Sequence, residues 1–187
     1  MNVILFGPPG AGKGTQAKFL VKQLDSFQIS TGDMLRDEIQ KNSEIGKKIV
    51  EDMSEGRFVS DEIVNSLIEN VVFDPNKKNK LIFDGCPKAL TQAKNLEKLL
   101  DKTNQKIDFV FFLNVNKETI IKRIEQRKSI ENRTDDDLNT IVKRYDKYME
   151  TTKPVLDFYS KNFNFYELDG SSKIEEITAK INSFLNV

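Results

Sequence analysis

The sequence predicts a single α/β domain in which a parallel sheet of about five strands lies between layers of helices. The chain has 187 residues, a usual length for one domain with a sizeable core. Short apolar runs alternate with amphipathic stretches throughout, which is typical of strand–helix repeats. A glycine-rich segment joins the first apolar run to the first amphipathic stretch, and this arrangement is typical of three-layer P-loop folds.

Each element is expected from a local pattern. The strands are expected at the apolar runs 3–6, 27–29, 81–83, 109–113 and 163–166. Helices are expected over 13–24, 34–40, 44–55, 61–70 and 91–100, around 120–124, and after the acidic run 135–137, because apolar residues recur there at helical spacing. Ser172-Lys173-Ile174-Glu175 has the pattern of a capping box and predicts the start of the last helix. Functional residues are expected directly after the strands, at the carboxyl edge of the sheet.

Composition argues against several classes of protein. Lys+Arg and Asp+Glu both number 29, so net charge favours neither nucleic acid nor membrane as a partner. The chain has no histidine, and Cys86 is its single cysteine. A disulfide within the chain and a cysteine zinc site are therefore excluded. Neither a secretory signal nor a membrane span of about 20 apolar residues is visible, and we expect a soluble, cytoplasmic protein.

Residues 7–15, Gly-Pro-Pro-Gly-Ala-Gly-Lys-Gly-Thr, predict a phosphate-binding loop. Glycines let backbone N–H groups surround phosphate oxygens, and the helix that follows adds the positive end of its dipole. Lys13 would contact the terminal phosphates of a nucleoside triphosphate, and the Thr15 hydroxyl suits Mg²⁺. Gly14 stands where the usual motif has Ser or Thr, so the loop is a variant. The alternative is a glycine-rich turn with an incidental lysine.

Further motifs follow the second and third strands: Ser30-Thr31-Gly32-Asp33-Met34-Leu35-Arg36 and Asp84-Gly85-Cys86-Pro87-Lys88. Together with the phosphate loop, and with Arg123, Arg127, Arg133, Asp135-Asp136 and Arg144, they resemble the nucleoside monophosphate kinase family, most closely its adenylate kinases. The resemblance covers the whole chain. It implies a monomer that converts ATP and AMP into two ADP with Mg²⁺ and so serves adenine nucleotide homeostasis.

The resemblance also implies a division into three parts. The core would be residues 1–29, 60–126 and 137–187, a helical AMP-binding insertion would be 30–59, and a short lid without zinc would be 127–136. Within the lid, Asp135 and Asp136 would orient the arginines.

The resemblance assigns site residues by position. ATP would contact Gly10, Ala11, Gly12, Lys13, Gly14, Thr15, Arg123, Arg127 and Ser172. AMP would contact Thr31, Arg36, Arg57, Phe58, Val59, Gly85, Cys86, Pro87, Lys88, Gln92, Arg133 and Arg144. Lys13, Lys88, Arg127, Arg133 and Arg144 would be catalytic, and Mg²⁺ would be held by Thr15 and, through water, by Asp84. Thr31 and Gln92 favour AMP, because the UMP/CMP branch tends to carry Ala and Asn at these positions.

Two residues depart from the family pattern, and alternatives remain open. Cys86 replaces an aromatic residue, and we expect a buried neutral thiol there rather than a nucleophile. Lys88 replaces an arginine that grips the AMP phosphate, and lysine cannot form the same paired, planar hydrogen bonds. Residues 30–33 could be only a helix cap, and the arginines only a solvated face. A CMP or UMP kinase and a nucleotide-binding regulatory protein with little turnover are the alternative functions.

Overall fold

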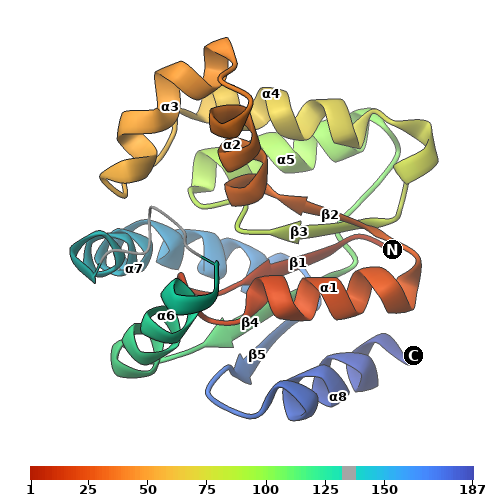
Figure 1. Ribbon diagram of the computed structural model, residues 1–187. Coiled ribbons are helices and arrows are strands. Elements are labelled where there is room, and N and C mark those ends of the chain that lie inside the picture. Colours follow the sequence, from red (N-terminus) through yellow and green to blue (C-terminus); the bar gives the residue numbers. More distant parts are fainter. Residues whose placement is uncertain (132–137) are drawn as a thin grey trace.

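The computed structural model describes residues 1–131 and 138–187. Five parallel strands form one sheet in the order β2-β3-β1-β4-β5 (Figure 1). The strands are β1 Val3–Phe6, β2 Phe27–Ser30, β3 Leu81–Asp84, β4 Phe109–Asn114 and β5 Phe165–Asp169. The predicted α/β class and parallel sheet are confirmed.

The central strands are continuous apolar runs because helices cover both faces of the sheet. Alternate side chains of β1 enter two separate hydrophobic cores. Ile4 and Phe6 belong to a core with α2 Thr31–Gln40, α3 Glu44–Ser54, α4 Asp61–Val72 and α5 Leu90–Lys102. Val3 and Leu5 belong to a core with α1 Lys13–Leu24, α6 Lys117–Glu131 and α8 Ile174–Leu185. The fold is therefore three-layered, with β1 at its centre.

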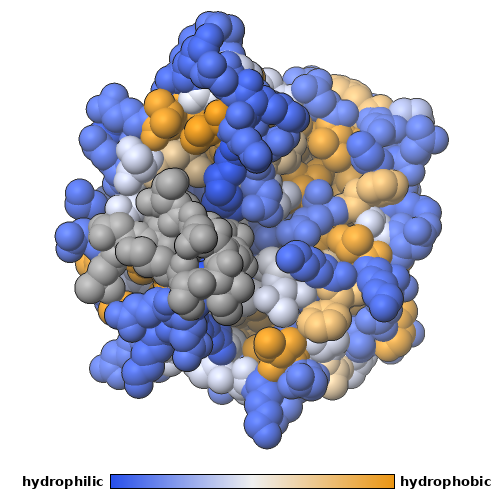
Figure 2. All heavy atoms as spheres, in the orientation of Figure 1, coloured by the Kyte–Doolittle hydropathy of each residue, from blue (hydrophilic) through white to orange (hydrophobic). Residues whose placement is uncertain are grey.

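The long helix α7 Leu138–Asn162 contributes to both cores. Ile141 near its start joins the core of α1, and Val155 and Tyr159 near its end join the core of α5. A short 3₁₀ helix, η1 Pro75–Lys77, follows α4. Hydrophilic side chains dominate the face of the molecule shown in Figure 2, and apolar groups are scattered among them. Within the described residues, no helix combines the length and the apolar character that crossing a membrane requires.

Several element boundaries differ from the predictions. Helix α2 begins at Thr31 rather than residue 34, because the Ser30 side chain caps it by accepting from the Asp33 N–H at 3.3 Å. Strand β5 begins at Phe165, two residues later than expected. The capping box at residues 172–175 is wrong: Lys173 precedes α8 without a side-chain cap, and the Ser172 hydroxyl donates to Asp169 Oδ2 at 3.3 Å.

Candidate active site

The carboxyl ends of β1, β2 and β3 bring three predicted motifs to one edge of the sheet. The register pairs Leu5 of β1 and Ser30 of β2 with Asp84 of β3. Beyond the strands, the Thr31 hydroxyl donates to the Gly85 carbonyl at 3.1 Å. The phosphate loop, the start of α2 and the segment after Asp84 are therefore neighbours, as the parallel topology requires.

The phosphate loop has the backbone conformation that its glycines allow. Gly10 and Gly12 have φ angles of +81° and +95°, in the region that favours glycine. At Gly10 a Cβ would lie 3.0 Å from the Ile124 side chain, which would have to give way by a few tenths of an ångström. Gly12 precedes α1, which has no side-chain cap. The first N–H groups of α1 are thus oriented for an anion at the positive end of the helix.

Cations are concentrated beside this loop. Lys13 donates to the Pro8 carbonyl at 3.0 Å. Its ammonium is surrounded by protein although the residue keeps some solvent contact, and this burial lowers its pKa to about 8. Asp84 opposes the shift, whereas Arg144 and Arg127 add to it. These charges act on Lys13 because α6 and α7 carry the two arginines to the phosphate loop.

Lys88 belongs to the same cluster. Burial lowers its pKa to about 8, and the nearby positive charges of Arg144 and Lys13 contribute in the same direction. Arg144 acts on both lysines and Lys13 acts on Lys88, so the three cations lie near one another. Such a concentration of positive charge in a desolvated site is stabilised by binding an anion.

Asp84 supplies the carboxylate of this cluster. It is buried, and its Oδ2 accepts from Gln28 Nε2 at 3.0 Å. A Cβ on Gly14 would lie 3.4 Å from the same oxygen, so the carboxylate faces the start of α1, where Thr15 follows. A carboxylate and a hydroxyl are oxygen donors that suit Mg²⁺. The described part of the chain has no group of three acidic, cysteine or histidine side chains that could hold a metal.

A narrow cavity of about 30 Å³ lies between the insertion and the sheet edge. Seven of its lining residues were predicted to contact AMP, and they are Thr31, Arg57, Phe58, Val59, Gly85, Lys88 and Gln92. Small-molecule pockets usually start at about 300 Å³. Side chains therefore fill most of the space that a ligand of nucleotide size would need.

Three lining residues, Leu35, Met53 and Val64, were not predicted. Their sequence pattern gives no functional signal, because apolar residues at helical spacing indicate a core.

Contacts inside this cavity connect the predicted residues. Lys88 Nζ lies over the Phe58 ring, 5.4 Å from its centroid. Gln92 is buried; its Oε1 accepts from the Lys88 N–H at 2.7 Å and its Nε2 donates to Asp61 Oδ1 at 2.6 Å. Sequence reasoning missed Asp61, because an acidic residue in the first turn of a helix is usual there for its effect on the dipole. One N–H of the Gln92 amide remains for a further acceptor.

The other predicted residues are spread around the same edge. Arg123 donates to the Ala11 carbonyl in the phosphate loop at 3.4 Å. Arg36 pairs with Asp33 at 2.6 Å, and Arg57 is exposed and pairs with Asp52 at 2.8 Å. Each of these two arginines therefore pairs with a carboxylate close to it in the sequence.

Cys86 is buried, and burial raises the pKa of its thiol to about 12. The thiol is therefore neutral at physiological pH, as predicted. Ser172 lies in the turn before α8, where its N–H donates to the Asp169 carbonyl at 3.3 Å. Arg133, Asp135 and Asp136, which the resemblance assigns to the lid, lie outside the described residues.

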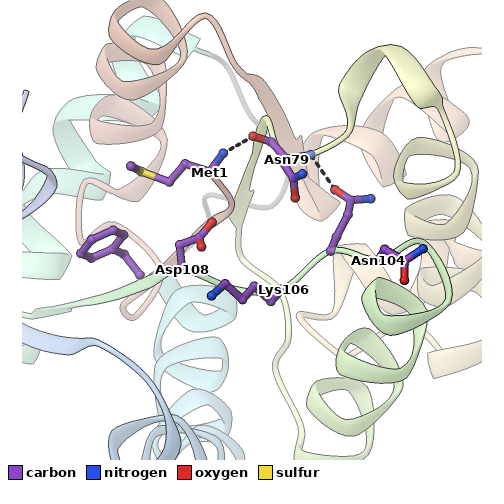
Figure 3. A pocket seen from close by; sticks show the side chains of 7 residues that line it. Met1, Asn79, Asn104, Lys106 and Asp108 are labelled. Carbon is purple, nitrogen blue, oxygen red and sulfur yellow. Dashed lines mark hydrogen bonds between the residues drawn. The ribbon is translucent and has the colours of Figure 1, made fainter.

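A larger cavity of about 600 Å³ lies at the opposite, amino edge of the sheet (Figure 3). Met1, Asn79, Lys106 and Asp108 are among its lining residues. The nearby amide of Gln105 is buried and used structurally: its Oε1 accepts from the Asn79 N–H at 2.7 Å and its Nε2 donates to the Val72 carbonyl at 3.2 Å. This cavity therefore marks a structural amide network and lies apart from the cation cluster.

Comparisons with known proteins agree with the site. The family model described as adenylate kinase matches residues 5–164. The adenylate kinase of Pelagibacter ubique is 46% identical over an alignment of 213 positions, which covers 100% of this chain and 100% of the relative. A Caulobacter species has an adenylate kinase 42% identical over 187 residues, covering 100% of this chain and 99% of the relative. The adenylate kinase of Archaeoglobus fulgidus is 36% identical, and the alignment covers 99% of this chain and 98% of the relative.

The matched region begins inside β1 and includes the phosphate loop, the strands β2, β3 and β4, and the cation cluster; it ends one residue before β5. Identities of this size over nearly the whole length of each relative are far above the level at which only the fold is shared. The chain belongs to the adenylate kinase family.

Proposed function

We propose that this chain transfers the terminal phosphoryl group of ATP to AMP and releases two molecules of ADP. The observation that carries the proposal is the cluster of Lys13, Lys88, Arg127 and Arg144 around Asp84, where the strands end beside the phosphate loop. Phosphoryl transfer spreads negative charge over the oxygens of the moving group, and its catalysis depends mainly on positioned cations.

On the donor side, the backbone N–H groups of Gly10 to Gly14 and the start of α1 would hold the ATP phosphates. Lys13 would follow the charge of the terminal phosphate into the transition state. Arg123 reaches the Ala11 carbonyl of this loop, a position suited to contact with ATP. Arg127 on the next turn of α6 would face the phosphates, and the backbone near Ser172 would pack against the adenine.

On the acceptor side, the cavity between α2, α4 and α5 would take the AMP base. Thr31 and Gln92 are buried at its wall and would form hydrogen bonds with adenine. The segment 57–59 would line the pocket with its backbone. Lys88 and Arg144 would neutralise the AMP phosphate, whose oxygen attacks directly, so no general base is needed in a chain without histidine.

The Asp84 carboxylate and the Thr15 hydroxyl are oxygen donors that suit Mg²⁺, and these two residues would hold the ion. When bound, Mg²⁺ would offset phosphate charge and orient the oxygens around the transferred group. Asp84 keeps its carboxylate toward α1 through the hydrogen bond from Gln28. No zinc is part of the proposal.

The enzyme would consist of a core, an AMP-binding insertion over 30–59 and a short lid over 127–136. Arg133 in the lid would join the phosphate-binding arginines, oriented by Asp135 and Asp136. The enzyme would act as a cytoplasmic monomer on ATP, AMP and ADP, without nucleic acid or membrane partners.

A coupled assay with AMP, CMP, UMP and GMP as acceptors tests the function. A site that hydrogen-bonds one base leaves buried groups unpaired with another, so AMP should exceed CMP and UMP in kcat/KM by about tenfold to a hundredfold. The Lys13→Met variant should lose several orders of magnitude in kcat while keeping its circular dichroism spectrum. Equal rates with CMP would favour a pyrimidine nucleotide kinase, and nucleotide binding without turnover would favour a regulatory protein.

A further inference from the structure

One stripe of α7 contacts three parts of the candidate site in turn. Thr140, Arg144, Tyr148 and Thr152 are spaced by four residues and share one face of the helix. The Thr140 hydroxyl donates to the Ser54 carbonyl of the insertion at 3.4 Å. Arg144 acts electrostatically on Lys13 and Lys88. The next position, Tyr148, lies one turn further along the same face.

Tyr148 has a buried hydroxyl that the proposed mechanism does not use. The residue is 8% exposed, and its oxygen has no hydrogen-bond partner within the part of the chain that the structure describes. Burial raises the pKa of the phenol, and the backbone N–H of Gly7 acts in the opposite direction. That N–H therefore lies beside the phenol oxygen without meeting the geometry of a hydrogen bond.

Gly7 is the first residue of the phosphate loop and is closely packed. A Cβ at this position would lie 2.9 Å from the Leu113 carbonyl of β4 and 3.0 Å from the Ala11 side chain. The loop is thus confined by β4 on one side and by its own turn on the other. Burying a hydroxyl oxygen without a partner is unfavourable, and a hydrogen bond from the neighbouring Gly7 N–H would remove this cost.

We propose that Tyr148 is a positioning residue whose hydroxyl accepts a hydrogen bond from the Gly7 N–H when the phosphate loop holds a nucleoside triphosphate. The bond sets the distance between the loop that carries Lys13 and the helix that carries Arg144, so the two cations meet the same phosphates. The proposal rests on the proposed function, because it assigns Tyr148 to the same phosphoryl-transfer site.

Tyr148→Phe tests the oxygen alone, since the ring and its packing remain. We expect kcat/KM for ATP to fall about tenfold, mainly in kcat, in line with one lost hydrogen bond. The melting temperature without nucleotide should stay equal or rise, because the variant removes an oxygen that is buried without a partner. The increase in melting temperature caused by ATP should become smaller than in the parent chain.

Two matched variants on α7 separate this role from a structural one. Thr152→Val removes another buried hydroxyl without a partner among the described residues, one turn beyond Tyr148. Tyr145→Phe removes a phenol oxygen from a ring that lies 5.5 Å from Lys117 Nζ. Both variants should keep parent kinetics within twofold.

Parent-like kcat/KM for ATP in Tyr148→Phe would overturn the proposal. An equal kinetic loss in Thr152→Val would also overturn it, since the hydroxyls would then act through helix stability. If the parent chain makes no ADP from ATP and AMP, the proposed function fails, while the ATP-dependent melting temperatures still decide whether Tyr148 supports the loop.

Discussion

Replacing Gly56 by alanine should impair the use of AMP, because this glycine lies where the insertion meets α7. Gly56 has a φ of +72°, in the left-handed region that L-residues rarely adopt. A Cβ there would lie 3.0 Å from Arg144 Cγ, 3.1 Å from Thr140 Cγ2 and 3.2 Å from the Thr140 carbonyl oxygen. Each contact is tight, so the neighbouring atoms or the insertion must shift by a few tenths of an ångström.

The loss in AMP use can be estimated from the left-handed backbone of Gly56 and from the tight contacts of the added Cβ. Left-handed backbone costs a residue with a Cβ about 1–2 kcal/mol. The contacts would also displace Arg144, which we propose binds phosphate, and would strain the hydrogen bond from Thr140 to the Ser54 carbonyl. If this strain appears in full in the transition state, kcat/KM for AMP should fall about 5- to 30-fold, the equivalent of about 1–2 kcal/mol.

Steady-state kinetics with AMP varied at saturating ATP measure this loss, together with the melting temperature. Asn42→Ala is the matched control, since Asn42 has a φ of +52° in the exposed turn between α2 and α3. The control should lower the melting temperature while kcat/KM for AMP stays within twofold of the parent. If Gly56→Ala also stays within twofold, the contact between the insertion and α7 has no role in AMP use, and the reasoning fails.

Further predictions concern the cations and the metal. Lys88→Arg should raise kcat/KM for AMP roughly tenfold, about 1.4 kcal/mol, because guanidinium orients a phosphate with paired bonds; an unchanged or slower variant would mean that Lys88 is already well placed or away from the phosphate. The pKa values of Lys13 and Lys88 are lowered to about 8, so both ammonium groups lose their protons as the pH rises through that value. A pH profile should therefore show kcat/KM declining above about pH 8. Between about pH 8 and about pH 10.4 the unfolded chain binds more protons at these lysines than the folded chain, so the free energy of unfolding should increase over that range. A flat kinetic profile up to about pH 10 would contradict this. EDTA should stop turnover by removing Mg²⁺ without changing the melting temperature, and metal analysis of the untagged protein should find no stoichiometric zinc. A large drop in melting temperature with EDTA would reveal a structural metal instead.

Local patterns predicted most elements well. Helix α1 runs from Lys13 to Leu24, as its apolar spacing indicates. The errors in predicted helix and strand boundaries occur where the local sequence is compatible with two structures. Phe163 looks like part of a strand, but its N–H donates to the Tyr159 carbonyl and continues the α7 turn. Ser172 has the sequence pattern of a helix cap, but its hydroxyl donates a hydrogen bond to Asp169 instead.

Helix α7 shows why sequence motifs alone could not predict every residue of the candidate site. Pro154 lies inside this helix, where sequence rules favour an end or a kink. The packing of Val155 and Tyr159 in the core offsets the hydrogen bond that proline removes. The same helix then extends one face past the insertion, the cation cluster and the phosphate loop, which no local pattern in the sequence indicates.

By itself, the sequence determined the α/β class, the phosphate loop and the family resemblance, because each depends on residues close together in the chain or on motifs in a fixed order. The glycine spacing around Lys13 is a pattern within a few residues, and the motifs after the strands follow one another in a fixed order. Only the tertiary structure decided which distant groups meet: Lys88 over Phe58, Asp61 on Gln92, Gly56 against Thr140, and Tyr148 beside Gly7. Contacts of this kind depend on how helices cross the edge of the sheet, and that geometry is set by packing of the two cores rather than by neighbours in sequence.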